Sequence, residues 1–209
     1  MRRYEVLQRI EAVGVVAVVR AENSEHARKI ALACMEGGID AIEITFTVPG
    51  AHKVIESLTE EFGDRLLVGA GTVLDSETAR IGILAGAKYV VSPAFDAETA
   101  KLCNRYQIPY MPGCMTLTEM IQAMEAGADV IKVFPGSLGG PDFIKAVKGP
   151  LPQAVLMPTG GVSLENVDQW INNGCIAVGV GGNLTKGTPE DMTKAAQALV
   201  AKVREARGQ

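Results

Sequence analysis

Residues 126–135, AGADVIKVFP, place a glycine directly before a short run that is apolar at almost every position, as in a strand buried on both faces. Three further segments share this design, GGIDAIEI (37–44), AGAKYVVSP (85–93) and NGCIAVGVGG (173–182). The shared glycines are Gly38, Gly86, Gly127 and Gly174, which are 48, 41 and 47 residues apart. This spacing predicts an architecture that repeats after every two strand–helix units.

Eight runs in the chain have the composition of a buried strand. They are Val15–Val19, Ala41–Thr45, Leu66–Ala70, Tyr89–Val91, Pro109–Met111, Val130–Val133, Val155–Met157 and Ile176–Val180. None alternates between apolar and polar residues, as a strand with one face in water would. We therefore expect parallel strands that are covered on both faces.

Helical patterns separate these strands. Four helices are expected to begin after a side chain that can cap them, namely Asn23, Thr116, Ser163 and Thr188. Glu119 strengthens the second of these starts, because it completes a capping box with Thr116. A further amphipathic helix is expected over residues 2–13, before the first strand.

Eight strands that alternate with helices in 209 residues leave about 26 residues per unit, near the lower limit of a (β/α)8 barrel. The alternative is a doubly wound open sheet, which would place a glycine-rich loop after the first strand. Val19 is instead followed by Arg-Ala-Glu. We therefore expect an α/β fold in which residues 1–209 form a single domain, a closed (β/α)8 TIM barrel with an extra N-terminal helix.

The composition excludes several classes of partner. Twenty basic residues against 24 acidic ones give no strong positive field, so neither nucleic acid nor a membrane surface is an expected partner. No apolar run approaches the roughly 20 residues that cross a bilayer. The charged start MRRYEVLQRI is unlike a signal peptide, so we expect a cytoplasmic protein. Four scattered cysteines and two histidines indicate neither a disulfide framework nor a metal cluster.

Lys132 lies in the otherwise apolar run 130–134. Burial would disfavour its ammonium form, and a neutral amine is a nucleophile for ketones. The first hypothesis is therefore Schiff-base chemistry. The alternative is a lysine whose stem packs while its head reaches solvent or a carboxylate.

Glu43 is a second charged residue between apolar neighbours, Ile42 and Ile44. If Glu43 and Lys132 both point into a barrel, they meet in one small pocket, where a carboxylate beside an amine can move protons. A structural buried ion pair is the alternative, but apolar residues would serve stability more readily.

Glycines cluster after the last two predicted strands, at Gly160-Gly161 and at Gly179, Gly181 and Gly182. A barrel commonly binds a phosphate at these positions through bare backbone N–H groups, which glycine lets the ligand approach. The two clusters together favour a phosphate site, although each alone would fit an ordinary turn.

Several motifs occur in order along nearly the whole chain. They are IEITFT (42–47), GAGTV (69–73), VSP (91–93), YMPG (110–113), IKVFPG (131–136), Gly149-Pro150, MPTGGV (157–162) and the glycine-rich run near Gly181. In these motifs the chain resembles the 2-keto-3-deoxy-6-phosphogluconate (KDPG) aldolase family, some members of which act on 4-hydroxy-2-oxoglutarate.

The resemblance implies a homotrimeric class I aldolase that needs no cofactor or metal. Its small-molecule partners would be a phosphorylated keto acid, pyruvate and glyceraldehyde 3-phosphate. Lys132 would form the Schiff base and Glu43 would act as general acid and base. The residues implied to bind substrate are Thr72 for the pyruvyl carboxylate, Pro93 and Phe134 as pocket walls, and Gly160, Gly161, Gly181, Gly182 and Asn183 for the phosphate.

The chain departs from the family pattern at two positions. Some members carry a carboxylate-binding arginine four residues after the glutamate, where this chain has Thr47. We expect Arg20, after the first strand, to supply that charge. Members also often have a serine where Gly182 stands, so phosphate binding would depend on backbone N–H groups and Asn183, with weaker discrimination against unphosphorylated substrates.

Two other functions stay open from the sequence. Another phosphate-binding barrel, an isomerase or synthase, would share the glycine clusters but would not need a lysine inside the sixth predicted strand. A non-catalytic or engineered oligomeric scaffold would retain all the motifs. The preferred configuration at substrate C4 also stays open, because gluconate-type and galactonate-type acids differ there.

Overall fold

The computed structural model describes residues 2–182 and 184–209. The strands are β1 Val15–Val19, β2 Ala41–Thr45, β3 Leu67–Gly71, β4 Val90–Val91, β5 Tyr110–Met111, β6 Gly113–Cys114, β7 Ile131–Val133, β8 Leu156–Pro158 and β9 Val178–Val180. The helices are α1 Arg3–Val13, α2 Ser24–Glu36, α3 Ala51–Phe62, α4 Ser76–Leu84, α5 Ala97–Tyr106, α6 Leu117–Glu125, α7 Gly136–Lys148, α8 Val167–Asn172 and α9 Pro189–Ala206, with a 3-10 turn η1, Gly63–Arg65, before β3. The eight predicted strands are confirmed, and the extra N-terminal helix is α1.

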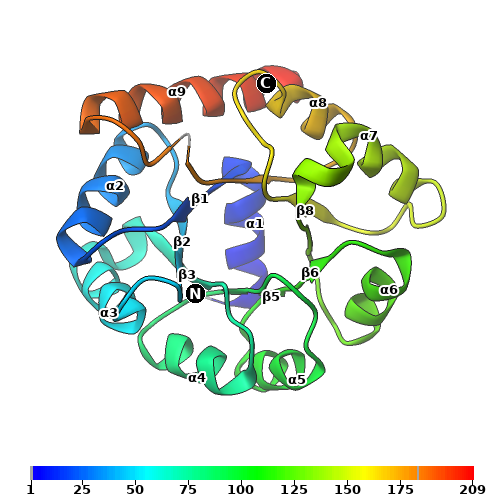
Figure 1. Ribbon diagram of the computed structural model, residues 1–209, viewed down its shortest axis with the longest axis horizontal. Helices are drawn as coiled ribbons and strands as arrows, with labels where there is room; N and C mark the ends of the chain where they lie inside the picture. The colour runs from blue at the N-terminus through cyan, green and yellow to red at the C-terminus, as the bar shows by residue number, and fades with distance from the viewer. Residues whose placement is uncertain (1, 183) are drawn as a thin grey trace.

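The predicted closed (β/α)8 TIM barrel is wrong, because the strands form two separate parallel sheets of order β5-β4-β3-β2-β1-β9 and β6-β7-β8. Pro112 separates β5 from β6, and Pro158 ends β8; neither residue has an N–H to continue a ladder. In the described residues, β8 and β9 are joined by isolated bridges, Leu156–Cys175 and Thr159–Gly179. The result is a curled six-stranded sheet facing a smaller sheet, with helices α2 to α9 around the outside (Figure 1).

Three of the four predicted helix starts are confirmed. The side chains of Asn23, Thr116 and Thr188 accept hydrogen bonds from the first turns of α2, α6 and α9. The prediction for Ser163 is wrong, because α8 begins after Asn166. Asn166 Oδ1 accepts from the Ser163 backbone N–H at 2.9 Å and from Trp170 Nε1 at 3.2 Å, so this asparagine orders the approach to α8.

The interior between the two sheets is apolar at one end, and α1 covers that end. Val6 and Ile10 of α1 are buried and belong to one cluster with strand residues that include Val16 and Met157. In Figure 1, α1 crosses the centre of the ring of strands. No helix in the described part of the chain is both long and apolar enough to span a membrane.

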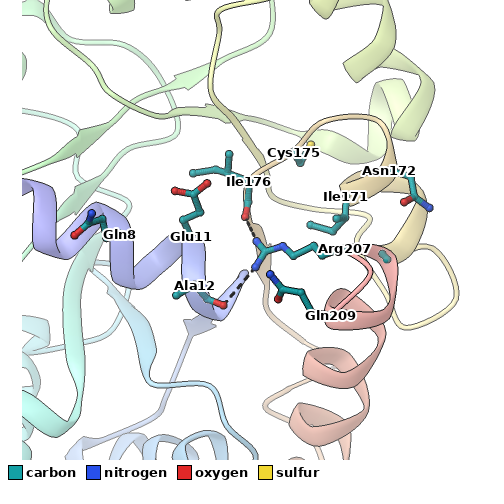
Figure 2. A pocket seen from close by; sticks show the side chains of 10 residues that line it. Gln8, Glu11, Ala12, Ile171, Asn172, Cys175, Ile176, Arg207 and Gln209 are labelled. Atoms are coloured by element: carbon teal, nitrogen blue, oxygen red, sulfur yellow. Dashed lines mark hydrogen bonds between the residues drawn. The ribbon is translucent and has the colours of Figure 1, made fainter.

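A cavity of about 800 Å³ lies beside α1, at the end of α9 and before β9 (Figure 2). Arg207 reaches across it and donates hydrogen bonds to the carbonyls of Ala12 and Ile176. A cation at a helix C-terminus satisfies carbonyls that the helix leaves unpaired. Arg207 therefore ties the end of α9 to α1 and to the chain entering β9.

Candidate active site

Lys132 and Glu43 face each other across the interior. Lys132 is the middle residue of β7 and Glu43 that of β2, so the two sheets each contribute one charge. Their side chains are 5% and 1% exposed, and Lys132 Nζ lies 3.9 Å from Glu43 Oε1. The structure therefore brings together the two residues that sequence analysis proposed as catalytic.

Glycine in β3 makes room for the Glu43 carboxylate. A Cβ added at Gly71 would lie 2.9 Å from Glu43 Oε1, closer than side chains normally pack. Glu43 Oε1 has no hydrogen-bond partner among the described residues, and the amine at 3.9 Å is beyond hydrogen-bond distance. This oxygen is thus available to exchange a proton with a group that binds beside it and Lys132.

Phe134 links the buried pair to an open pocket. Its ring centroid lies 4.9 Å from Lys132 Nζ, and Phe134 also lines a pocket of about 360 Å³. The other residues that line this pocket are Val18, Arg20, Thr159, Gly160, Gly161, Val162, Ser163, Gly179, Gly181 and Gly182. The pocket therefore unites both predicted glycine clusters with Arg20 and Phe134.

Arg20 lies at the glycine-rich side of this pocket. Its Nη1 is 3.4 Å from the point where a Cβ on Gly181 would stand. Sequence analysis assigned Arg20 to the substrate carboxylate. Its position beside Gly181 puts a cation next to the glycine loops, whose backbone N–H groups are of a kind that binds anions.

Thr159 is a candidate that sequence analysis left without a role. It is buried, its Oγ1 has no hydrogen-bond partner in the described residues, and it lines the same pocket. A Cβ on Gly179 would lie 2.3 Å from that oxygen, so glycine is needed opposite it. The available signal was a hydroxyl directly before Gly160-Gly161, after a predicted strand.

Three other predicted residues do not line the glycine-rich pocket. Thr72 directly follows Gly71 and has φ 55°, a left-handed conformation that is costly for a β-branched residue and typical of functional sites. Thr47 is exposed, and its Oγ1 lies 2.8 Å from Thr45 Oγ1. Pro93 packs its carbonyl against Gly113, where a Cβ would be 2.1 Å away. Asn183 lies outside the described residues.

The cysteines are packing residues. Burial raises the pKa of Cys34, Cys103, Cys114 and Cys175 to about 12, so none forms a thiolate nucleophile at neutral pH. Within residues 2–182 and 184–209, no group of three or more His, Cys, Asp or Glu side chains is placed to hold a metal ion. Lys132 is therefore the buried nucleophile that the described site presents.

The chain is similar to several known aldolases. The chain is 35% identical over 195 residues to 2-dehydro-3-deoxy-6-phosphogalactonate aldolase of Escherichia coli, covering 92% of this chain and 95% of that protein. It is 36% identical over 167 residues to 2-dehydro-3-deoxy-phosphogluconate aldolase of Treponema pallidum, covering 79% of each.

A solved structure of KDPG aldolase from Legionella pneumophila, with pyruvate captured as a covalent carbinolamine intermediate, matches with a TM-score of 0.82 and 28% identity. The match covers 99% of this chain and 98% of that one. The family model for KDPG and KHG aldolase matches residues 6–199, nearly the whole chain. The chain therefore belongs to the KDPG and KHG aldolase family.

Proposed function

We propose that this chain is a class I aldolase that cleaves 2-dehydro-3-deoxy-6-phosphogluconate to pyruvate and glyceraldehyde 3-phosphate, and that also cleaves 4-hydroxy-2-oxoglutarate to pyruvate and glyoxylate. The observation that carries the proposal is the 3.9 Å separation of Lys132 Nζ and Glu43 Oε1 in a buried site. The covalent carbinolamine of the Legionella pneumophila relative supports the same chemistry.

Lys132 supplies the nucleophile. Its neutral amine adds to the C2 ketone of the substrate, and the carbinolamine that forms loses water to give an iminium. The iminium accepts the electron pair of the C3–C4 bond when that bond breaks. The Lys132 side chain is buried between apolar residues of β7, and the Phe134 ring centroid lies 4.9 Å from its Nζ.

Glu43 moves the protons. It protonates the departing hydroxyl of the carbinolamine and then, as carboxylate, takes the proton of the C4 hydroxyl through a water molecule. The aldehyde leaves, and the enamine on Lys132 is protonated at C3 and hydrolysed to pyruvate. Both steps need a carboxyl group next to the amine, which the opposed β2 and β7 provide.

The glycine-rich pocket binds the phosphate. We assign this role to Gly160, Gly161, Gly181 and Gly182, to Asn183 and to the guanidinium of Arg20, whose position beside Gly181 supports an anion at this end. Thr72 binds the pyruvyl carboxylate, with Thr47 nearby on the loop after β2. Pro93 and Phe134 form the walls around the keto acid.

The assembly and the compartment are part of the proposal. We propose that residues 1–209 form one domain that assembles as a homotrimer in the cytoplasm. Support for assembly comes from exposed apolar side chains on neighbouring helices, including Ile81 and Leu84 of α4. The four free, buried cysteines suit a reducing compartment. Light scattering on the purified chain measures its mass and tests the trimer.

The test of the chemistry is reductive trapping. Borohydride added with pyruvate is expected to leave a stable mass increase on Lys132, located by peptide mapping, because reduction fixes the iminium as a secondary amine. Pyruvate release from gluconate-type and galactonate-type substrates, coupled to lactate dehydrogenase, then gives the preferred configuration at C4. Absence of an adduct on Lys132 would instead support a phosphate-binding isomerase or synthase.

A further inference from the structure

Tyr89, the residue before β4, has its hydroxyl buried in an apolar cluster, where an unpaired polar group costs stability. The residue is 0% exposed and packs in the apolar cluster that α1 covers. Its hydroxyl has no hydrogen-bond partner among the described residues. Buried polar groups are normally paired, so this hydroxyl calls for a physical reason.

The ring of Tyr89 extends toward Glu43. A Cβ added at Gly69 would lie 2.3 Å from Tyr89 Cε2 and Cζ, so the hydroxyl end of the ring overlies Gly69. Gly69 is the register partner of Glu43 in the β2–β3 ladder. Two glycines of β3 therefore make room on one side of the interior, Gly69 for the Tyr89 ring and Gly71 for the Glu43 carboxylate.

The charges around Tyr89 keep its phenol neutral. Burial raises its pKa well above 10, and the negative charges of Glu43 and then Asp40 raise it further. Arg9 opposes this effect, but it forms an ion pair with Asp40 at 2.9 Å. Lys132 Nζ lies 3.9 Å from Glu43 Oε1. A neutral phenol can donate a hydrogen bond to a carboxylate, directly or through a water.

We propose that Tyr89 is a positioning residue for the proton-transfer step, and that its hydroxyl donates through one bridging water to Glu43 Oε1. Both oxygens are buried and lack partners in the described residues, and one water satisfies both. The water-mediated bond orients the carboxylate toward Lys132 and stabilises its ionised form. This inference rests on the proposed aldolase function.

Tyr89→Phe removes the hydroxyl and keeps the ring that fills the space over Gly69. We expect kcat to fall about tenfold, because a hydrogen bond to a charged group is lost, while KM stays within about twofold. A carboxylate with one donor fewer is protonated at higher pH. The acidic limb of the kcat–pH profile is therefore expected to move to higher pH. Tyr106→Phe, at the exposed end of α5, is the matched control with an unchanged profile.

The outcomes separate this inference from the function on which it rests. If the unaltered chain releases no pyruvate from keto acids, the aldolase proposal itself fails. If that chain is active and the kcat–pH profile of the Tyr89→Phe variant superimposes on the profile of the unaltered chain, the hydroxyl does not act on Glu43 and the inference is overturned. A Tyr89→Phe variant that also loses trapping of pyruvate on Lys132 would indicate a role in folding, which equally overturns it.

Discussion

Lys132→Met is expected to abolish aldol cleavage, with kcat falling roughly 10⁶-fold, the scale seen when a covalent nucleophile is removed from an enzyme. Methionine has a similar length and suits the apolar neighbours of Lys132 in β7, but it offers no amine to the C2 ketone. Pyruvate release coupled to lactate dehydrogenase measures the loss. Borohydride treatment with pyruvate is expected to leave this variant unlabelled.

Lys53→Met, on the exposed face of α3, is the matched control and is expected to keep full activity. The stability of the Lys132 variant is informative as well. Removing one partner of a buried pair leaves Glu43 without its cation, so a lower melting temperature is expected whatever the function. Equal turnover in the Lys132→Met variant and the unaltered chain would exclude Schiff-base catalysis and support a scaffold or an isomerase.

The sequence predicted the strands well because each is a short apolar run after a turn, and such runs are buried wherever the chain places them. The four repeated glycines behave as expected, each with φ between 86° and 104° at the entry to a strand. The closed barrel was predicted wrongly because the prediction counted strands and did not consider which of their residues lack a backbone N–H donor. Pro112 and Pro158 interrupt the ladder at two places where a closed barrel would continue it.

The candidate site was predictable where a charge interrupts an apolar strand. Lys132 and Glu43 are conspicuous for that reason, and so are the glycine clusters after two strands. Tyr89 gives no such signal, because an aromatic residue in a strand is ordinary. The significance of its hydroxyl depends on Gly69 and Glu43 in other strands, and so on the register between them.

Arg20 illustrates the same limit. Its place after the first strand predicted that it would reach the mouth of the site, but the sequence did not show which of the other loops it would lie beside. The guanidinium lies beside Gly181 because β1 and β9 are paired neighbours. Strand order, which is a property of the whole fold, thus decides where this cation lies.

Glu43→Gln is expected to lower kcat by about 10²- to 10⁴-fold, the usual contribution of a general acid–base group. The amide has nearly the size of the carboxyl group, so it fits the space that Gly71 leaves and should disturb the pocket little. KM is expected to change by less than about threefold, because the phosphate and carboxylate contacts lie elsewhere. Borohydride is still expected to label Lys132 in the presence of pyruvate, but more slowly, since water leaves the carbinolamine without an acid.

The Glu43→Asp variant tests whether the position of the carboxyl group matters as well as its presence. Aspartate keeps the acid–base function but withdraws it from Lys132 by one methylene, so we expect a rate between those of the Gln variant and the unaltered chain. If Glu43 were present only as the ionic partner of Lys132, both variants would lose stability, measured by thermal unfolding, yet retain turnover. A graded loss of kcat, with labelling of Lys132 preserved, assigns the proton transfers to the carboxyl group and leaves carbon–nitrogen bond formation to the lysine.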